Sequence, residues 1–268
     1  MILLVDVGNT RIKWSLGVSE RCCAGAFERR SPDWDAEHLV AAISSATMSS
    51  SITGVIVPTE VWVASVASIE FQDYLAQSVA KVWGCVLRFA AVQPGLLGLQ
   101  LAYQDAQQLG VDRWLVMLAA QHRAKGKAVV VVDAGSAITV DYLGSSGRHL
   151  GGLIAPGVRM MQRALFSDTA RVKVKPLTLP QTWRPGKDTL SCVEQGVATM
   201  LRGFYSQLNS DVNSLGCEFE QAVWFVTGGD AVLFSGQQSL NAVVVEDLVL
   251  VGLSLWGLAN SDCSSPRA

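Results

Sequence analysis

The N-terminal sequence combines residue types that can bind phosphate. An apolar run ends at Asp6 and continues into the turn Val-Gly-Asn-Thr-Arg, residues 7–11. A glycine in a tight turn lets backbone N–H groups approach an anion, and Asn9 and Thr10 add side-chain donors. Asp6 could hold a hydrated Mg²⁺, an ion that takes few carboxylates and keeps several waters. The same residue types also make ordinary hairpins, and the spacing is not that of a P-loop.

A second segment repeats this pattern. LLVDVGNTRIKWSL (3–16) and VVVDAGSAITVDYL (130–143) align without gaps at an offset of 127, which places Asp133, Gly135 and Ser136 after another apolar run. The repeat predicts a duplicated chain whose halves meet near residue 115. Two phosphate hairpins, one in each half, resemble the nucleotide cleft of the actin-like ATPase and sugar-kinase superfamily.

A third motif, Leu-Gly-Val-Asp-Arg-Trp, occupies residues 109–114. Asp112 could accept the proton of a substrate hydroxyl, and Arg113 could hold a substrate carboxylate through two parallel N–H bonds. An exposed Asp–Arg ion pair is the competing interpretation. Because the motif lies just before the second hairpin, the catalytic interpretation is favoured over the exposed ion pair.

Paired glycines close two further apolar runs, in GGLIAPG (151–157) and TGGDA (227–231). Glycine at a strand end permits close backbone approach to a ligand, but it equally permits tight packing of neighbouring elements. The second motif resembles the adenosine-side turn of the actin-like fold.

Composition excludes several classes of protein. With 21 basic and 23 acidic residues, the 268-residue chain has no basic stripe for nucleic acid. The longest apolar candidate, 248–259, is shorter than the roughly 20 residues of a membrane span and predicts a buried helix. The N-terminus lacks the basic region of a signal peptide, so we expect a cytoplasmic protein without membrane contact. Cysteines without CxxC spacing argue against zinc and disulfides: Cys22, Cys23, Cys85, Cys192, Cys217 and Cys263.

Hydrophobic periodicity predicts an α/β fold in which strands alternate with helices. The expected strands are 2–6, 11–17, 61–67, 85–90, 128–133, 138–143, 149–156, 222–229 and 241–247. The expected helices are 31–45, 69–83, 112–124, 188–208 and a last one after 247. The first begins at a Ser31-Pro32 cap. We expect an N-terminal domain (1–115), a C-terminal domain (116–260) and a frayed tail (261–268).

Taken in order, the five motifs resemble those of the type III pantothenate kinases, also called the Bvg accessory factor family. The resemblance extends from Met1 to about Ala259. It implies two ribonuclease H-like domains with a nucleotide cleft between them, and a homodimer with shared active sites. It also implies ATP-dependent phosphorylation of pantothenate, the first step of coenzyme A synthesis, with Mg²⁺ and a monovalent cation (K⁺ or NH₄⁺).

The resemblance also implies roles for single residues. The ATP loop of the family matches Asp6, Val7, Gly8, Asn9, Thr10, Arg11, Ile12 and Lys13, and a second ATP contact matches Ser136. Asp112 matches the catalytic base, and Asp133 matches the ligand of the monovalent cation. The pantothenate contacts match Tyr103, Gly110, Val111, Asp112 and Arg113, with Thr189 contributed by the neighbouring subunit. The sequence departs from the family at Ser136, where Thr is usual, and at Ala106, where Pro is common.

Two alternatives remain open. Another small kinase of the actin-like superfamily would share both hairpins, although sugar kinases are commonly much longer. A regulatory accessory protein of the same fold would not need the intact acidic residues Asp6, Asp112 and Asp133.

Overall fold

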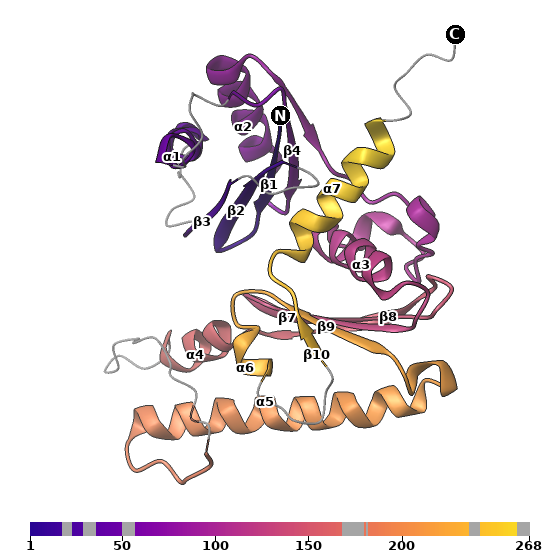
Figure 1. The fold of residues 1–268 in the computed structure, drawn as a ribbon. Coiled ribbons are helices and arrows are strands. Elements are labelled where there is room, and N and C mark those ends of the chain that lie inside the picture. Colours follow the sequence, from indigo (N-terminus) through magenta and orange to yellow (C-terminus); the bar gives the residue numbers. More distant parts are fainter. Residues whose placement is uncertain are drawn as a thin grey trace. The chain divides into compact units, whose positions relative to one another are not determined.

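The computed structural model describes residues 1–17, 23–28, 36–49, 57–167, 180, 182–235 and 242–261 (Figure 1). The chain forms two compact units. One consists of residues 1–122 and the segment from Asp247 onward, and the other consists of residues 123–246. In the part of the chain that is described, no helix is long and apolar enough to cross a membrane.

The first unit is built on a five-stranded sheet of order β3-β2-β1-β4-β5. Its strands are β1 (Ile2–Val7), β2 (Arg11–Leu16), β3 (Cys23–Glu28), β4 (Glu60–Ser65) and β5 (Val86–Phe89). β1 runs antiparallel to β2 and parallel to β4. One face packs on α1 (Ala36–Ser49) and α2 (Ile69–Trp83), where Val5 and Trp14 meet Leu39 and Leu75 in one core. Two 3₁₀ turns, η1 (Leu96–Gly98) and η2 (Ala106–Gln108), lead to α3 (Val111–Ala124).

The second unit contains another five-stranded sheet, of order β10-β9-β6-β7-β8. Its strands are β6 (Val129–Ala134), β7 (Ala137–Leu143), β8 (His149–Pro156), β9 (Val223–Thr227) and β10 (Ala242–Val244). Its helical elements are α4 (Val158–Ser167), α5 (Thr189–Ser214), η3 (Cys217–Phe219) and α6 (Val232–Ser235). Leu201, Tyr205 and Leu208 of α5 bury the face of the sheet that carries Val130 and Val140.

Both sheets have the same topology, which confirms the predicted duplication. Counted within each unit, the strand order is third, second, first, fourth, fifth. The first three strands pair antiparallel, and the fourth and fifth are added in parallel. The alignment without gaps is wrong after the turn, because the second turn is one residue shorter. Val7 pairs with Ile12, whereas Ala134 pairs with Ile138. Trp14 therefore corresponds to Val140, and each faces the core of its own unit.

The terminal helix α7 (Leu248–Ser261) packs on β1 and β4. As predicted it is largely buried, and glycines bring it close to its neighbours. A Cβ on Gly252 would overlap the backbone of Leu115, and one on Gly257 would overlap the ring of Trp62. Because of this packing, α7 belongs to the same unit as the first sheet and most of α3. The two units therefore differ from the expected domain ranges 1–115 and 116–260.

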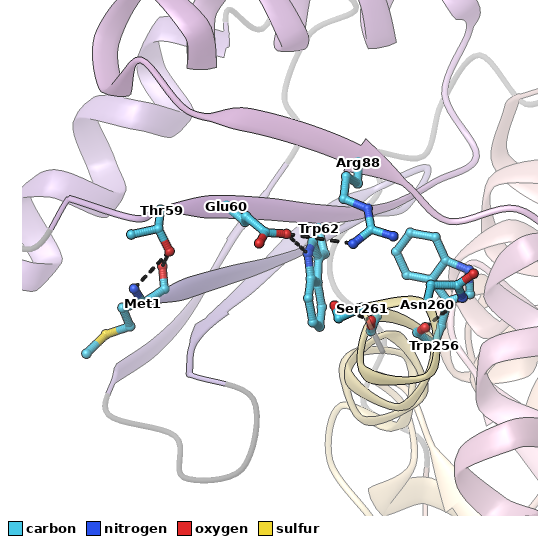
Figure 2. A network of polar contacts seen from close by, with 9 residues as sticks. Met1, Thr59, Glu60, Trp62, Arg88, Trp256, Asn260 and Ser261 are labelled. Carbon is cyan, nitrogen blue, oxygen red and sulfur yellow. Dashed lines mark hydrogen bonds and ion pairs between the residues drawn. The ribbon is translucent and has the colours of Figure 1, made fainter. Parts of the chain in front are cut away.

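The side chain of Trp256 joins α7 to the sheet, and Figure 2 shows it near Trp62 and Arg88. The indole N–H of Trp62 donates to Glu60 over 2.9 Å, and the ring meets that of Trp256 edge-on at a centroid distance of 6.4 Å. The guanidinium of Arg88 lies 5.4 Å from the centroid of the Trp256 ring, within the range of a cation–π contact.

Most expected elements occur, with shifted ends. α5 continues to Ser214, beyond the predicted residue 208, and α1 reaches Ser49. The Ser31-Pro32 cap and the tail from residue 262 lie outside the described residues. Cys85, Cys192 and Cys217 are free thiols.

Candidate active site

The first hairpin turn joins β1 to β2. The N–H of Gly8 donates to the carbonyl oxygen of Arg11 over 3.0 Å, and a Cβ on Gly8 would lie only 3.1 Å from that oxygen. Glycine therefore allows the tight closure of this turn. Asp6 and Lys13 are register partners on the two strands, so their side chains emerge on the same face. The Lys13 ammonium lies 3.0 Å from the carboxylate of Asp247.

The LGVDRW motif forms the start of α3. The helix begins at Val111, so Asp112 lies in its first turn, where the helix dipole favours negative charge. Asp112 Oδ1 accepts the backbone N–H of Arg113 over 2.8 Å. A Cβ on Gly110 would lie 2.5 Å from the same oxygen. The Asp112 carboxylate thus occupies space that only glycine leaves open.

Arg113 is buried, with 8% of its surface exposed, which disfavours an exposed Asp–Arg pair. Its Nη1 donates to the hydroxyl oxygen of Tyr103 over 2.9 Å. The guanidinium carbon also lies 5.8 Å from the centroid of the Tyr103 ring. These two contacts position the guanidinium beside the first turn of α3.

The second hairpin turn joins β6 to β7, and the other glycine motifs pack around it. The N–H of Gly135 donates to the carbonyl oxygen of Ala137 over 2.9 Å, and that of Gly157 donates to Ser136 over 3.1 Å. A Cβ on Gly157 would overlap the carbonyl oxygen of Gly135. A Cβ on Gly228 would overlap Ala134 and lie 2.5 Å from Asp133 Oδ1. For Gly157 and Gly228, close packing accounts for the residue type.

Thr189 is the exposed first residue of α5. Asp188 precedes it as the N-cap, and its carboxylate accepts the backbone N–H of Ser191 over 2.8 Å. The Ser191 hydroxyl oxygen in turn accepts the backbone N–H of Asp188, and the two hydrogen bonds form a capping box. Hydrogen bonds from Ser191 hold the pKa of the Asp188 carboxyl below its usual value. The start of the helix is therefore well fixed at Thr189.

The predicted site residues are divided between the two units. The first unit holds the β1–β2 turn and, at the start of α3, Gly110, Asp112 and Arg113 with Tyr103. The second unit holds Asp133 and Ser136 at the β6–β7 turn, and Thr189 on α5. Asp247, which pairs with Lys13, was not predicted as a site residue. The only signal in the sequence was an acidic residue directly before the expected terminal helix.

Two five-stranded sheets of one topology, each with a glycine turn between its first two strands, define the actin-like ATPase and sugar-kinase fold. Two solved structures share this fold at low identity. The activator of the 2-hydroxyisocaproyl-CoA dehydratase from Clostridium difficile, with bound ADPNP, has a TM-score of 0.57 at 12% identity and covers 100% of this chain and 98% of its own. A Campylobacter jejuni protein described as a Baf family transcriptional activator has a TM-score of 0.56 at 20% identity. This match covers 97% of this chain and 99% of the Campylobacter jejuni chain.

Sequence comparison is more specific. The profile of the type III pantothenate kinases matches residues 2–210. A type III pantothenate kinase from Teredinibacter turnerae is 38% identical over 253 residues, which are 94% of this chain and 97% of the relative. One from Marinobacter nauticus is also 38% identical, over 94% of this chain and 96% of the relative. The chain belongs to the type III pantothenate kinase family. It uses ATP to phosphorylate pantothenate in coenzyme A biosynthesis.

Proposed function

We propose that Asp112 is the general base of this reaction. The primary hydroxyl of pantothenate gives its proton to the Asp112 carboxylate as the hydroxyl oxygen bonds to the γ-phosphorus of ATP and the bond to ADP breaks. A loose transition state releases the proton late, so the reaction does not require a strong base. The observation that carries the proposal is the seating of Asp112 Oδ1 between Gly110 and the N–H of Arg113. We assign the other oxygen, Oδ2, to the substrate.

Arg113 and Tyr103 hold the pantothenate carboxylate. A guanidinium recognises a carboxylate through parallel N–H bonds, and the contact with Tyr103 fixes its direction. The Tyr103 hydroxyl accepts from Arg113 and can donate its own proton to the substrate. Gly110 and Val111 form the backbone beside these groups.

The segment of residues 6–13, with its glycine turn between β1 and β2, binds the phosphates of ATP. The Ser136 hydroxyl is assigned as a further ATP contact. A single carboxylate at a strand end, Asp6, suits Mg²⁺, which keeps most of its water. When bound, Mg²⁺ would neutralise phosphate charge. Asp133, at the equivalent strand end, holds the monovalent cation, K⁺ or NH₄⁺.

The active enzyme is a homodimer with shared sites, and its compartment is the cytoplasm. Thr189 completes the pantothenate site of the neighbouring subunit. Its exposure at a fixed helix start supports a role toward a partner.

The test is to supply a panel of alcohols with ATP, Mg²⁺ and K⁺ and to measure ADP formation. Pantothenate should react, whereas pantothenol, which lacks the carboxylate that Arg113 binds, should need a far higher concentration. Equal use of pantothenol would contradict the proposal that Arg113 binds the carboxylate of the substrate. Preference for a sugar would contradict the proposed substrate site.

A further inference from the structure

Lys13 and Asp247 form an ion pair beside the first hairpin, with 3.0 Å between Nζ and Oδ1. Both side chains are 22% exposed, so the pair is shielded but not sealed from water. A surface pair of this kind contributes little to stability. Its position is therefore of more interest than its strength.

The pair lies on the face of the first sheet that α7 covers. Ile12 and Trp14 on either side of Lys13 point into the core with α1 and α2, so Lys13 points to the opposite face. Asp6, its register partner, shares that face. Lys13 consequently has two acidic neighbours, Asp6 across the strand and Asp247 at the start of α7.

Asp247 is fixed in place by the backbone. Its φ of 58° is in the left-handed region, which non-glycine residues adopt only where the surroundings require it. Its carbonyl oxygen accepts the N–H of Val251 over 3.1 Å, in the first turn of α7. Asp247 is also the residue at which the chain returns from the second unit to the first.

We propose that Asp247 is a positioning residue for ATP that acts through Lys13. A lysine ammonium has three donors, so a bond to Asp247 leaves two for phosphate oxygens. The long lysine stem would otherwise let the ammonium pair with Asp6. Asp247 thus holds the Lys13 ammonium at the turn. The inference rests on the proposed ATP-binding role of the β1–β2 turn.

The test is calorimetric titration of the full chain with ADP in the presence of Mg²⁺, comparing wild type, Asp247→Asn, Lys13→Met and the double variant. Asp247→Asn should weaken ADP binding about tenfold, the effect of one charge-assisted hydrogen bond. Once Lys13 is Met, Asp247→Asn should have little further effect. Asp247→Glu should restore part of the affinity. The KM for ATP should rise in parallel, with kcat and the KM for pantothenate nearly unchanged.

Glu37→Gln is the matched control, because it breaks another 3.0 Å lysine pair of the same unit, with Lys81. It should leave ADP binding unchanged. Unchanged binding in Asp247→Asn, or additive effects in the double variant, would overturn the inference. So would equal losses for both substrates together with a lower melting temperature, since these indicate a general packing role. A wild type that binds ADP but leaves pantothenate unphosphorylated would instead contradict the proposed function and leave the binding test valid.

Discussion

The Nη1 atom of Arg113 donates a hydrogen bond of 2.9 Å to the hydroxyl oxygen of Tyr103, and the guanidinium lies beside the aromatic ring of the same residue. Arg113 is buried, so this contact replaces water that the guanidinium loses on folding. Tyr103 precedes α3, whereas Arg113 belongs to its first helical turn. The pair therefore fixes the loop and the helix that carry the proposed pantothenate site.

Replacing Tyr103 by Phe tests this relationship. The ring stays, but the acceptor for Arg113 is lost, and we expect the KM for pantothenate to rise roughly tenfold, the usual effect of one hydrogen bond to a charged group. The KM for ATP should stay within about a factor of two of wild type. Steady-state kinetics with each substrate varied would measure both. A change confined to ATP would contradict the assignment of Tyr103.

Gly110→Ala should damage catalysis without unfolding the protein. The new Cβ would lie 2.5 Å from Asp112 Oδ1, so the carboxylate must move. A displacement of about 1 Å at a reacting group can cost roughly 10²-fold in rate, and we expect kcat to fall by about that factor. Gly203→Ala is the control, because its Cβ meets no atom within 4 Å and it lies inside α5. That variant should keep full activity, and normal kcat in Gly110→Ala would show that Asp112 tolerates the shift.

Removal of the monovalent cation tests Asp133. Exchange of K⁺ for tetramethylammonium should abolish phosphorylation by wild type, because the bulky ion cannot bind at a single carboxylate beside the turn. Asp133→Asn should lose the response to K⁺. The assay is ADP release at constant ionic strength. Activity that does not depend on the cation would contradict this role and would mean that Asp133 only orders its hairpin.

Mixed dimers test the role of Thr189. Asp112→Asn chains and Thr189→Trp chains should each be inactive alone. After re-pairing, about half of the dimers are mixed and each of these has one intact site, so about a quarter of wild-type activity should return. Native mass spectrometry would verify the mixing. Mixed dimers without activity would mean that Thr189 does not complete its neighbour's site.

The sequence predicted the duplication because each buried strand is a nearly continuous apolar run followed by an acid and a glycine turn. It did not predict β3, since CAGAFE has small residues and no such run at the edge of the sheet. Nor could it place the one-residue difference between the turns, because both second strands alternate with the same period.

Site residues close together in the sequence were easier to predict than distant ones. Asp112 and Arg113 lie in one helical turn, whereas Lys13 and Asp247 are far apart along the chain and meet only because α7 packs on β1 and β4. The glycine motifs were ambiguous for a similar reason. Only the structure shows that Gly157 and Gly228 pack against the second hairpin.

The most direct test of the account is single-turnover phosphoryl transfer by Asp112→Asn. The amide keeps the size of the side chain and loses the negative charge that accepts the proton. With radiolabelled ATP and saturating pantothenate, transfer should slow by about 10²–10⁴-fold, while ATP binding and the melting temperature stay close to wild type. Transfer at the wild-type rate would contradict Asp112 as the base and, with it, the proposed mechanism.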